Sequence, residues 1–347
     1  MNVALLKELA EAPGIPGREE RVRDIVRREM KGLVDSVTTD AMGNVIGRKG
    51  SGGPRVMLAA HMDEIGFFVR HVEDKGFLRL QTVGGFDARQ LFAQRVLVHT
   101  RKGESLRGVL TYATKPTHLL SDSERNKSPE ITEFFVDVGM GADAVKERVS
   151  VGDMVTMDRT LEEVGDCLIS KSMDNRVSVF VMLEALRKAG PLSCEVAAVA
   201  TVQEEVGLRG AQTAAFSVDP AIGIALDTTI AADHPGGTDA EAVTRIGQGT
   251  AIKIMDSSII SHPKLIDHMR SLAEGAGIPH QMEILPRGGT DGGTLQRARG
   301  GNVCMTLSVP TRYVHTVNEM IHRKDLQATI DLLALYLEHA PEGDYAL

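Results

Sequence analysis

Four runs of mostly apolar residues stand out along the chain, and each has the length of a buried β-strand. They span residues 55–60, 196–202, 221–226 and 302–309. Continuous apolar runs of this length are typical of central strands in a sheet that is covered on both faces. Around these runs, apolar residues recur at intervals of three and four, which predicts amphipathic helices. The predicted helices span residues 16–34, 176–189, 264–276 and 324–339.

The pattern changes between residues 66 and 158, where short alternating stretches are separated by glycines. Alternation of apolar and polar positions predicts strands with one exposed face, as in a small barrel. The polar, serine-rich stretch 115–130 is expected to be a mobile surface loop. We therefore predict an α/β fold. Residues 1–65 and 161–347 form a main domain with a mixed sheet in three layers, and residues 66–160 form an inserted β-barrel-like domain.

Composition narrows the classes of function. The 347 residues carry a net charge of −8 and no long basic run, which argues against a nucleic-acid partner. The three cysteines are far apart, so neither a disulfide framework nor a cysteine zinc site is indicated. No apolar run reaches the roughly 18 residues of a membrane span. The first residues do not resemble a signal peptide, and we expect a cytoplasmic protein.

Polar residues with metal-binding side chains follow each of the four apolar runs. His61 and Asp63 follow the first, Glu204 and Glu205 the second, Asp227 the third and His315 the fourth. Because ligands of open α/β sheets bind at the carboxyl ends of strands, we expect these side chains to converge there. Glu204 and Glu205 are expected to alternate in direction at the strand end.

A further carboxylate, Asp174, stands at the predicted start of a helix. Carboxylate and imidazole ligands without thiolate suit zinc, cobalt or manganese. Three carboxylates and two histidines exceed the three protein ligands usual for one catalytic zinc. Two metal ions that share a bridging carboxylate would account for the number.

Each of these residues also has a simpler explanation when it is taken alone. Glu204 and Glu205 could be a solvated pair at a strand end. His61 could be a structural histidine, and Asp174 could cap its helix. Convergence of all of them at one sheet edge favours the metal site.

Several motifs resemble the M42 family of dinuclear metallo-aminopeptidases, the tetrahedral or TET aminopeptidases. The motifs occur in the family's order over almost the whole chain. They are His61-Met62-Asp63-Glu64-Ile65-Gly66, Met173-Asp174-Asn175-Arg176, Gln203-Glu204-Glu205-Val206-Gly207, Leu226-Asp227, Gly288-Gly289-Thr290-Asp291 and Arg312-Tyr313-Val314-His315.

The resemblance implies a role for each candidate residue. Asp174 would bridge two divalent ions, zinc or cobalt. His61 and Asp227 would complete one metal site, and Glu205 and His315 the other. Glu204 would be the general acid and base, and Asp63 would orient His61.

The resemblance also implies the substrate and the assembly. The main domain would be a peptidase that releases N-terminal residues from short peptides. The inserted domain would mediate dimerisation and a tetrahedral homododecamer built from dimers. Two departures from the family pattern, His234 and Gly292-Gly293-Thr294, fall near the expected substrate face. They bear on side-chain preference rather than on the chemistry.

Three alternatives remain open at this stage. A deacylase or a carboxypeptidase could use the same scaffold. A glycosidase is disfavoured because Glu204 and Glu205 are neighbours in sequence and aromatic residues make up only 4% of the chain. A non-catalytic metal-binding protein would not need Glu204, because the other carboxylates and the two histidines suffice to hold two metal ions.

Overall fold

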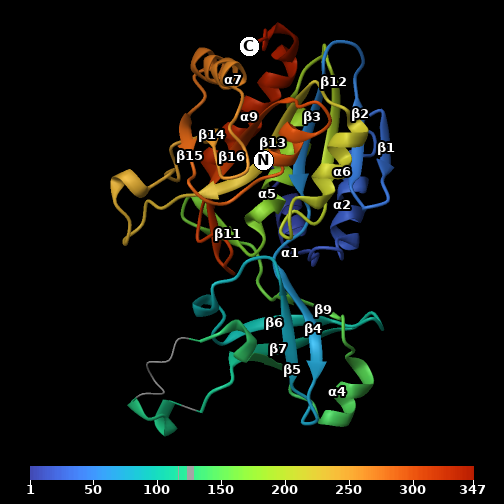
Figure 1. The fold of residues 1–347 in the computed structure, drawn as a ribbon, viewed down its shortest axis with the longest axis vertical. Coiled ribbons are helices and arrows are strands. Elements are labelled where there is room, and N and C mark those ends of the chain that lie inside the picture. The colour runs from blue at the N-terminus through green and yellow to red at the C-terminus, as the bar shows by residue number, and fades with distance from the viewer. Residues whose placement is uncertain (116, 123–128) are drawn as a thin grey trace. The chain divides into compact units, whose positions relative to one another are not determined.

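The computed structural model describes residues 1–115, 117–122 and 129–347 (Figure 1). These residues form two compact units. The larger contains Met1–Glu64, Thr160–Val314 and Asn318–Leu347, and the smaller contains Ile65–Arg159 and His315–Val317. The loop predicted at residues 115–130 lies partly outside the described residues.

Eleven strands of the larger unit form one mixed sheet within the described residues. The strand order is β1-β2-β12-β3-β13-β16-β17-β11-β10, with β14 paired to β16 and β15 paired to β14. The strands are β1 (Ser36–Thr39), β2 (Val45–Lys49), β3 (Arg55–His61), β10 (Glu162–Val164), β11 (Cys167–Ser170), β12 (Glu195–Thr201), β13 (Ile222–Ile230), β14 (Thr250–Met255), β15 (His280–Ile284), β16 (Val303–Arg312) and β17 (Glu319–His322). The central strands β12, β3, β13 and β16 are parallel, so their carboxyl ends lie at one edge.

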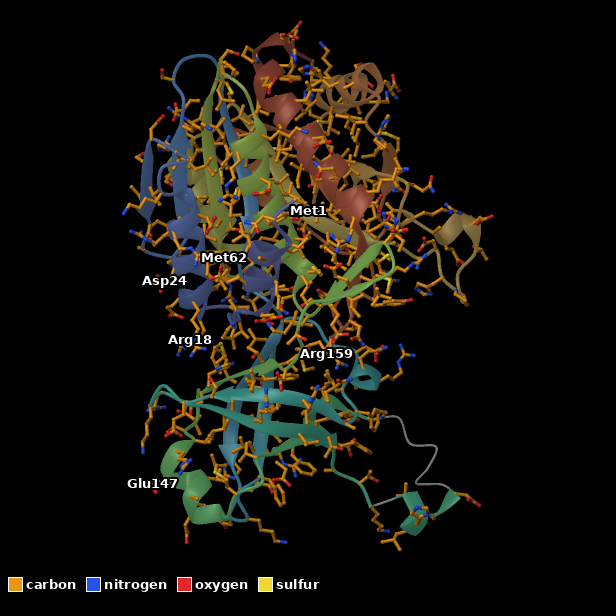
Figure 2. All side chains as sticks on the ribbon, turned by 180° about the vertical axis from the view of Figure 1, so that it is seen from behind. Met1, Arg18, Asp24, Met62, Glu147 and Arg159 are labelled. Atoms are coloured by element: carbon orange, nitrogen blue, oxygen red, sulfur yellow. The ribbon has the colours of Figure 1, made fainter. Side chains whose placement is uncertain are left out.

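Helices cover both faces of this sheet (Figure 1). One face packs against α1 (Val3–Glu11), α2 (Glu20–Met30), α5 (Met173–Lys188), α7 (Pro263–Ala276) and α9 (Arg323–His339). The other packs against α6 (Arg209–Val218) and α8 (Gly292–Arg297). α2 buries Val22 and Ile25, whereas Asp24 lies on its exposed side (Figure 2).

Successive side chains of the central strands pack into different hydrophobic cores, one on each face of the sheet. Leu58 of β3 packs in the core beneath α5 and α9, whereas Met57 and Ala59 pack beneath α6 and α8. Side chains of a strand alternate between faces, so a strand covered on both sides must be apolar throughout. The three-layer arrangement and the mixed sheet that the sequence predicts are therefore confirmed.

The smaller unit is a closed barrel with the strand order β4-β5-β8-β7-β6-β9, which confirms the predicted barrel. Its elements are β4 (Gly66–Val72), β5 (Leu78–Val83), β6 (Gln94–His99), β7 (Ser105–Tyr112), β8 (Phe134–Asp137), α4 (Ala142–Arg148) and β9 (Met154–Met157). Phe67, Val96 and Val136 pack inside it. Glu147 of α4 is exposed and points away from the barrel strands (Figure 2).

Several element boundaries differ from the predictions. The helix predicted at 16–34 is only Glu20–Met30, and Gly32 takes a positive φ of 82° soon after it ends. The strand predicted at 221–226 continues to Ile230, because Thr228 and Thr229 still pair with β16. β8, β10, β11, β14, β15 and β17, which are three to six residues long, were not predicted from the sequence.

The expectation that strand alternation sets the directions of Glu204 and Glu205 is wrong. β12 ends at Thr201, and Gln203 has a φ of +55°, which a strand does not allow. Both glutamates therefore lie in a turn, and alternation along a strand does not determine their directions.

No helix among the described residues combines the length and the apolar composition needed to cross a membrane.

Gly210 allows α6 to begin directly beside β12. Its amide donates to the Val202 carbonyl at 3.0 Å, and a Cβ here would collide with the Val202 backbone and the Asn44 side chain. We expect Gly210→Ala to lower the free energy of unfolding by about 1–3 kcal/mol, as overpacking does. Denaturant titration measures this change.

Gly275→Ala is the matched control, because Gly275 is an exposed position of α7 with open space around its Cβ. The free energy of unfolding of this variant should be unchanged or higher by up to about 1 kcal/mol, because alanine has a higher helix propensity than glycine. Equal destabilisation by both substitutions would contradict the steric explanation.

Candidate metal centre

Three of the predicted ligands meet at the carboxyl edge of the central strands. His61 ends β3, Asp227 lies in β13, and Asp174 lies at the start of α5. One ligand atom from each lies within 4.8 Å of the other two. The Nε2 atom of His61 is 3.3 Å from Oδ1 of Asp174 and 3.9 Å from Oδ1 of Asp227. This spacing is compatible with one cation between the three side chains.

The two glutamates lie beside this cluster. Glu204 and Glu205 each bring a carboxylate oxygen within 4.8 Å of a His61 ring nitrogen. A carboxylate oxygen of Glu205 is also within 4.8 Å of one from Asp174. Asp174 therefore lies close to both His61 and Glu205, as a residue shared by two sites must.

Asp63 holds the turn that carries the glutamates. Its two carboxylate oxygens accept the backbone amides of Glu204 and Glu205, both at 3.1 Å. The same residue also contacts His61, whose Nδ1 is 3.0 Å from the Asp63 main-chain carbonyl and 3.6 Å from its carboxylate. A histidine held at Nδ1 presents Nε2 to a metal. Asp63 thus contacts both the imidazole and the glutamate turn.

The start of α5 is irregular where it carries Asp174. Ser172, in the left-handed region with a φ of 58°, occupies the N-cap position, so Asp174 is not the cap that its position would favour. The Asp174 amide instead donates to the Glu319 carboxylate at 2.9 Å. The Asn175 side chain donates to the Leu226 carbonyl at 2.8 Å, directly before Asp227. The second contact joins the segment that carries Asp174 to the strand that carries Asp227.

A buried group of charges lies behind the end of β3. The Arg176 guanidinium is fully buried and donates to the carbonyls of Met62, Leu9, Ala12 and Gly14. Glu64 accepts from Lys171 at 2.7 Å and lies 3.5 Å from Arg176. Buried charges need such partners, and here the partners attach the α5 start to the strand that ends in His61.

Burial and mutual repulsion shift the pKa values of the site residues. Burial raises the pKa of Glu204 well above its usual range, with opposition from His61 and reinforcement from Asp227. Burial likewise raises the pKa of Asp227, again opposed by His61. Burial lowers the pKa of His61, but the neighbouring carboxylates, Glu204 first, raise it well above its usual range.

Two buried carboxylates near the site were not assigned a role from sequence. Asp291 accepts the Thr201 hydroxyl at 2.6 Å, and burial raises its pKa to about 6. Burial, with repulsion from Asp63, raises the pKa of Glu19 to about 7. Asp291 ends the motif Gly288-Gly289-Thr290-Asp291, and this motif could have identified it as a site residue. Glu19 precedes a surface helix, and nothing in that pattern distinguishes it.

His315 follows β16 in the segment His315–Val317, which belongs to the smaller unit. Its φ is +63°, and Tyr313 two residues earlier has a φ of +61°. Such values are uncommon outside glycine and concentrate at functional sites. The left-handed Ser172 and Gln203 flank other predicted ligands in the same way.

Known proteins resemble this chain over nearly its whole length. It is 34% identical to the lysyl aminopeptidase of Pyrococcus furiosus, over 98% of each chain. An aminopeptidase structure from Desulfurococcus kamchatkensis is 41% identical with a TM-score of 0.93, over 98% of this chain and 95% of the other. The structure of the Pyrococcus horikoshii TET1 peptidase is 32% identical with a TM-score of 0.87, over 96% of this chain and 98% of the other.

The family described as M42 glutamyl aminopeptidase matches residues 43–332. This range begins before β3 and ends within α9, so it includes every predicted site residue. The resemblance read from the sequence motifs is confirmed, and the chain belongs to the M42 family of peptidases.

Proposed function

We propose that this protein is a metal-dependent aminopeptidase that releases N-terminal residues from short peptides with the help of two divalent ions. The observation that carries the proposal is the cluster of His61, Asp174 and Asp227, with their ligand atoms within 4.8 Å of one another. Glu204 lies beside it, with its Oε2 3.8 Å from His61 Nε2.

The residues of the site fit divalent cations. Their donor atoms are carboxylate oxygens and imidazole nitrogens, which suit zinc, cobalt and manganese. The raised pKa values of Glu204 and Asp227 reflect buried negative charge that a cation would stabilise. Oδ1 of Asp291 is buried without a hydrogen-bond partner among the described residues. Asp291 therefore adds to the buried negative charge that a cation would stabilise.

Two sets of residues would hold the ions. His61, Asp227 and Asp174 would hold one, and Asp174, Glu205 and His315 would hold the other. When bound, such ions polarise a peptide carbonyl and lower the pKa of water. Asp63 fixes the His61 ring and the glutamate turn, so that the ligands are in place before any ion binds.

Glu204 is the residue that we propose to move the proton. It would accept a proton from the attacking water and return it to the leaving amine nitrogen as the peptide C–N bond breaks. Its burial supports this role, because burial keeps the protonated form of a carboxyl accessible near neutral pH. The surplus of carboxylates would also attract the cationic N-terminus of a peptide, which favours cleavage from that end.

We also propose a homo-oligomer. The TET1 peptidase of Pyrococcus horikoshii, whose structure is similar to that of this chain, can assemble into a tetrahedron or a large octahedral shell. Residues 66–160 would mediate dimerisation and further assembly, and residues 1–65 and 161–347 would form the catalytic domain. A tetrahedral dodecamer built from dimers is the assembly that we propose.

A substrate panel tests the reaction. Aminoacyl anilides should be hydrolysed in the presence of zinc, cobalt or manganese, and a chelator should abolish the activity reversibly. N-acylated peptides should resist cleavage. Turnover of N-acylated peptides with no activity on the anilides would indicate the deacylase or carboxypeptidase alternative instead.

We expect Glu204→Gln to lower kcat by about 10²–10⁴-fold, because the amide cannot accept the proton. Elemental analysis should show the wild-type metal content, since Glu204 is not among the proposed ligands. Glu184→Gln is a matched control on the outer part of α5, where Glu184 pairs with Arg187. It should retain activity. Unimpaired turnover by the Glu204 variant would refute the assignment.

Asp291→Asn should stabilise the metal-free protein in a pH-dependent way. Asp291 has a folded-state pKa of about 6 against an ordinary value of 3.8, so its ionisation opposes folding as pH rises through this window. The gain in unfolding free energy over wild type should be near zero below pH 4. It should reach at most about 3 kcal/mol above pH 7.

Denaturant titrations of chelated protein across this pH range measure the effect. The Thr201 hydroxyl can still donate to the asparagine carbonyl, so the one contact of Asp291 Oδ2 is retained. A stability difference that stays constant between pH 4 and pH 7 would contradict the electrostatic explanation.

A further inference from the structure

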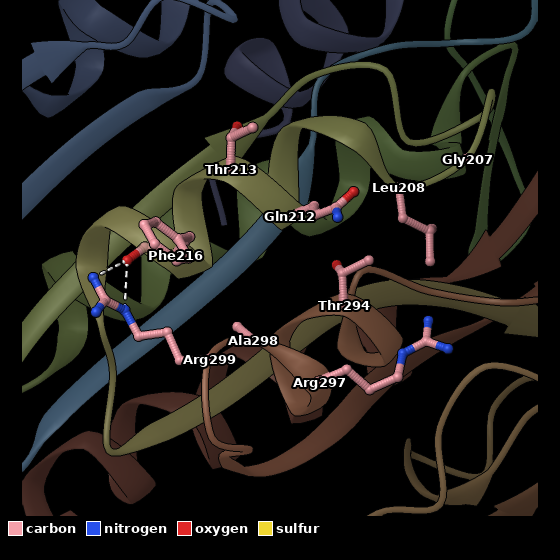
Figure 3. Close-up of a pocket in the computed structure, with 9 residues that line it drawn as sticks. All are labelled: Gly207, Leu208, Gln212, Thr213, Phe216, Thr294, Arg297, Ala298 and Arg299. Atoms are coloured by element: carbon pink, nitrogen blue, oxygen red, sulfur yellow. Dashed lines mark hydrogen bonds between the residues drawn. The ribbon is translucent and has the colours of Figure 1, made fainter.

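A pocket of about 800 Å³ lies between α6 and α8. Leu208, Gln212, Phe216, Thr294, Arg297 and Arg299 contribute to its wall. Figure 3 shows the two arginines at opposite ends, with Leu208 and Thr294 toward the Arg297 end and Phe216 beside Arg299. The pocket is an open groove, since Phe216, Arg297 and Arg299 are exposed, and its volume is within the range of ligand-binding clefts.

The rim of this pocket is hydrogen-bonded to the metal centre's carboxylate residues. The amides of Gly207 and Leu208 both donate to the Glu204 carbonyl at 2.9 Å. On the opposite side, the Thr294 amide and hydroxyl donate to the Asp291 carbonyl at 3.1 and 2.9 Å. Hydrogen bonds to main-chain carbonyls thus join the pocket rim to Glu204, which we propose to move the proton, and to the buried Asp291.

The charge of the pocket differs from the rest of the chain. The chain carries a net charge of −8, but the residues that line the pocket include two arginines and no aspartate or glutamate. An anionic group is thus the complementary ligand.

The two arginines are not equivalent. Arg299 donates twice to the Phe216 carbonyl, at 2.8 and 2.6 Å, lies 3.2 Å from the Asp219 carboxylate and stacks 4.3 Å above the Phe216 ring. Its guanidinium is engaged within the protein. Arg297 donates through Nε alone, to the Gly293 carbonyl at 2.8 Å.

Both terminal nitrogens of Arg297 lack a hydrogen-bond or ion-pair partner among residues 1–115, 117–122 and 129–347. A guanidinium with two free nitrogens matches the two oxygens of a carboxylate. Leu208, at the same end of the pocket, offers apolar surface next to that position (Figure 3).

We infer that this pocket binds the C-terminal carboxylate of short peptide substrates, with Arg297 as the anion-binding residue. The inference rests on the proposed function and adds to it a preference for free-acid peptides. The C-terminal carboxylate is the one anion that every unmodified peptide carries, whatever its sequence. Leu208 would contact the side chain next to it, while the N-terminus of the same peptide lies at the metal centre.

A comparison of three substrates tests this inference on the assembled, metal-loaded enzyme. The substrates share the N-terminal residue that is hydrolysed best: a tripeptide free acid, the same tripeptide as its C-terminal amide, and an aminoacyl anilide. The wild type should show about a tenfold higher kcat/KM for the acid than for the amide, mainly through KM. Arg297→Gln should abolish this ratio and leave anilide hydrolysis unchanged.

Two further variants separate charge from structure. Arg297→Lys should retain part of the preference, because it keeps the charge but loses the bidentate geometry. Arg299→Gln should retain all of it, because Arg299 is engaged by Phe216 and Asp219. The mass of each assembly should equal that of the wild type.

The outcomes are distinguishable. An acid-to-amide ratio below twofold in the wild type, or a ratio that persists in Arg297→Gln, would overturn the inference while anilide turnover upholds the proposed function. A smaller assembly in Arg297→Gln with an unchanged ratio would mean that a second copy of the chain covers the pocket, which also overturns it. Absence of anilide turnover in the wild type would refute the proposed function and this inference together.

Discussion

The gathering of buried carboxylates around one imidazole is the constraint on which the rest of this structure depends. Glu204, Asp227 and Asp291 lie near His61, and burial raises the pKa of each carboxyl. Like charges held together away from water oppose folding unless protons or cations compensate them. Under the proposed function, divalent ions bound here would compensate this charge and so favour folding.

The surroundings of the site show how such a cluster is kept in place. Asp63 binds the two amides of the glutamate turn and contacts the His61 ring. Arg176 binds four carbonyls, among them that of Met62 between His61 and Asp63. The proposed ligands are therefore positioned by neighbours that are themselves hydrogen-bonded, which would limit the movement needed for ion binding.

The left-handed residues belong to the same arrangement. Ser172, Gln203, Tyr313 and His315 each precede or form part of a predicted ligand segment. Such conformations cost roughly 1–3 kcal/mol each and persist only where surrounding contacts determine the backbone. At this edge of the sheet, β3 and β12 are packed on both faces, and Asp63 binds the two amides that follow Gln203.

The sequence by itself determined the fold class and the candidate ligands. Uninterrupted apolar runs predict strands covered on both faces, and the residues after them, His61 and Glu204 among them, predict a site at their carboxyl ends. These inferences succeed because burial and side-chain chemistry are properties of local sequence. Only the tertiary structure placed Glu204 and Glu205 in a turn, showed that Asp63 holds that turn, and brought the Arg297 side chain into the wall of a pocket beside it. Each of these depends on contacts between residues far apart in the chain, which no local pattern encodes.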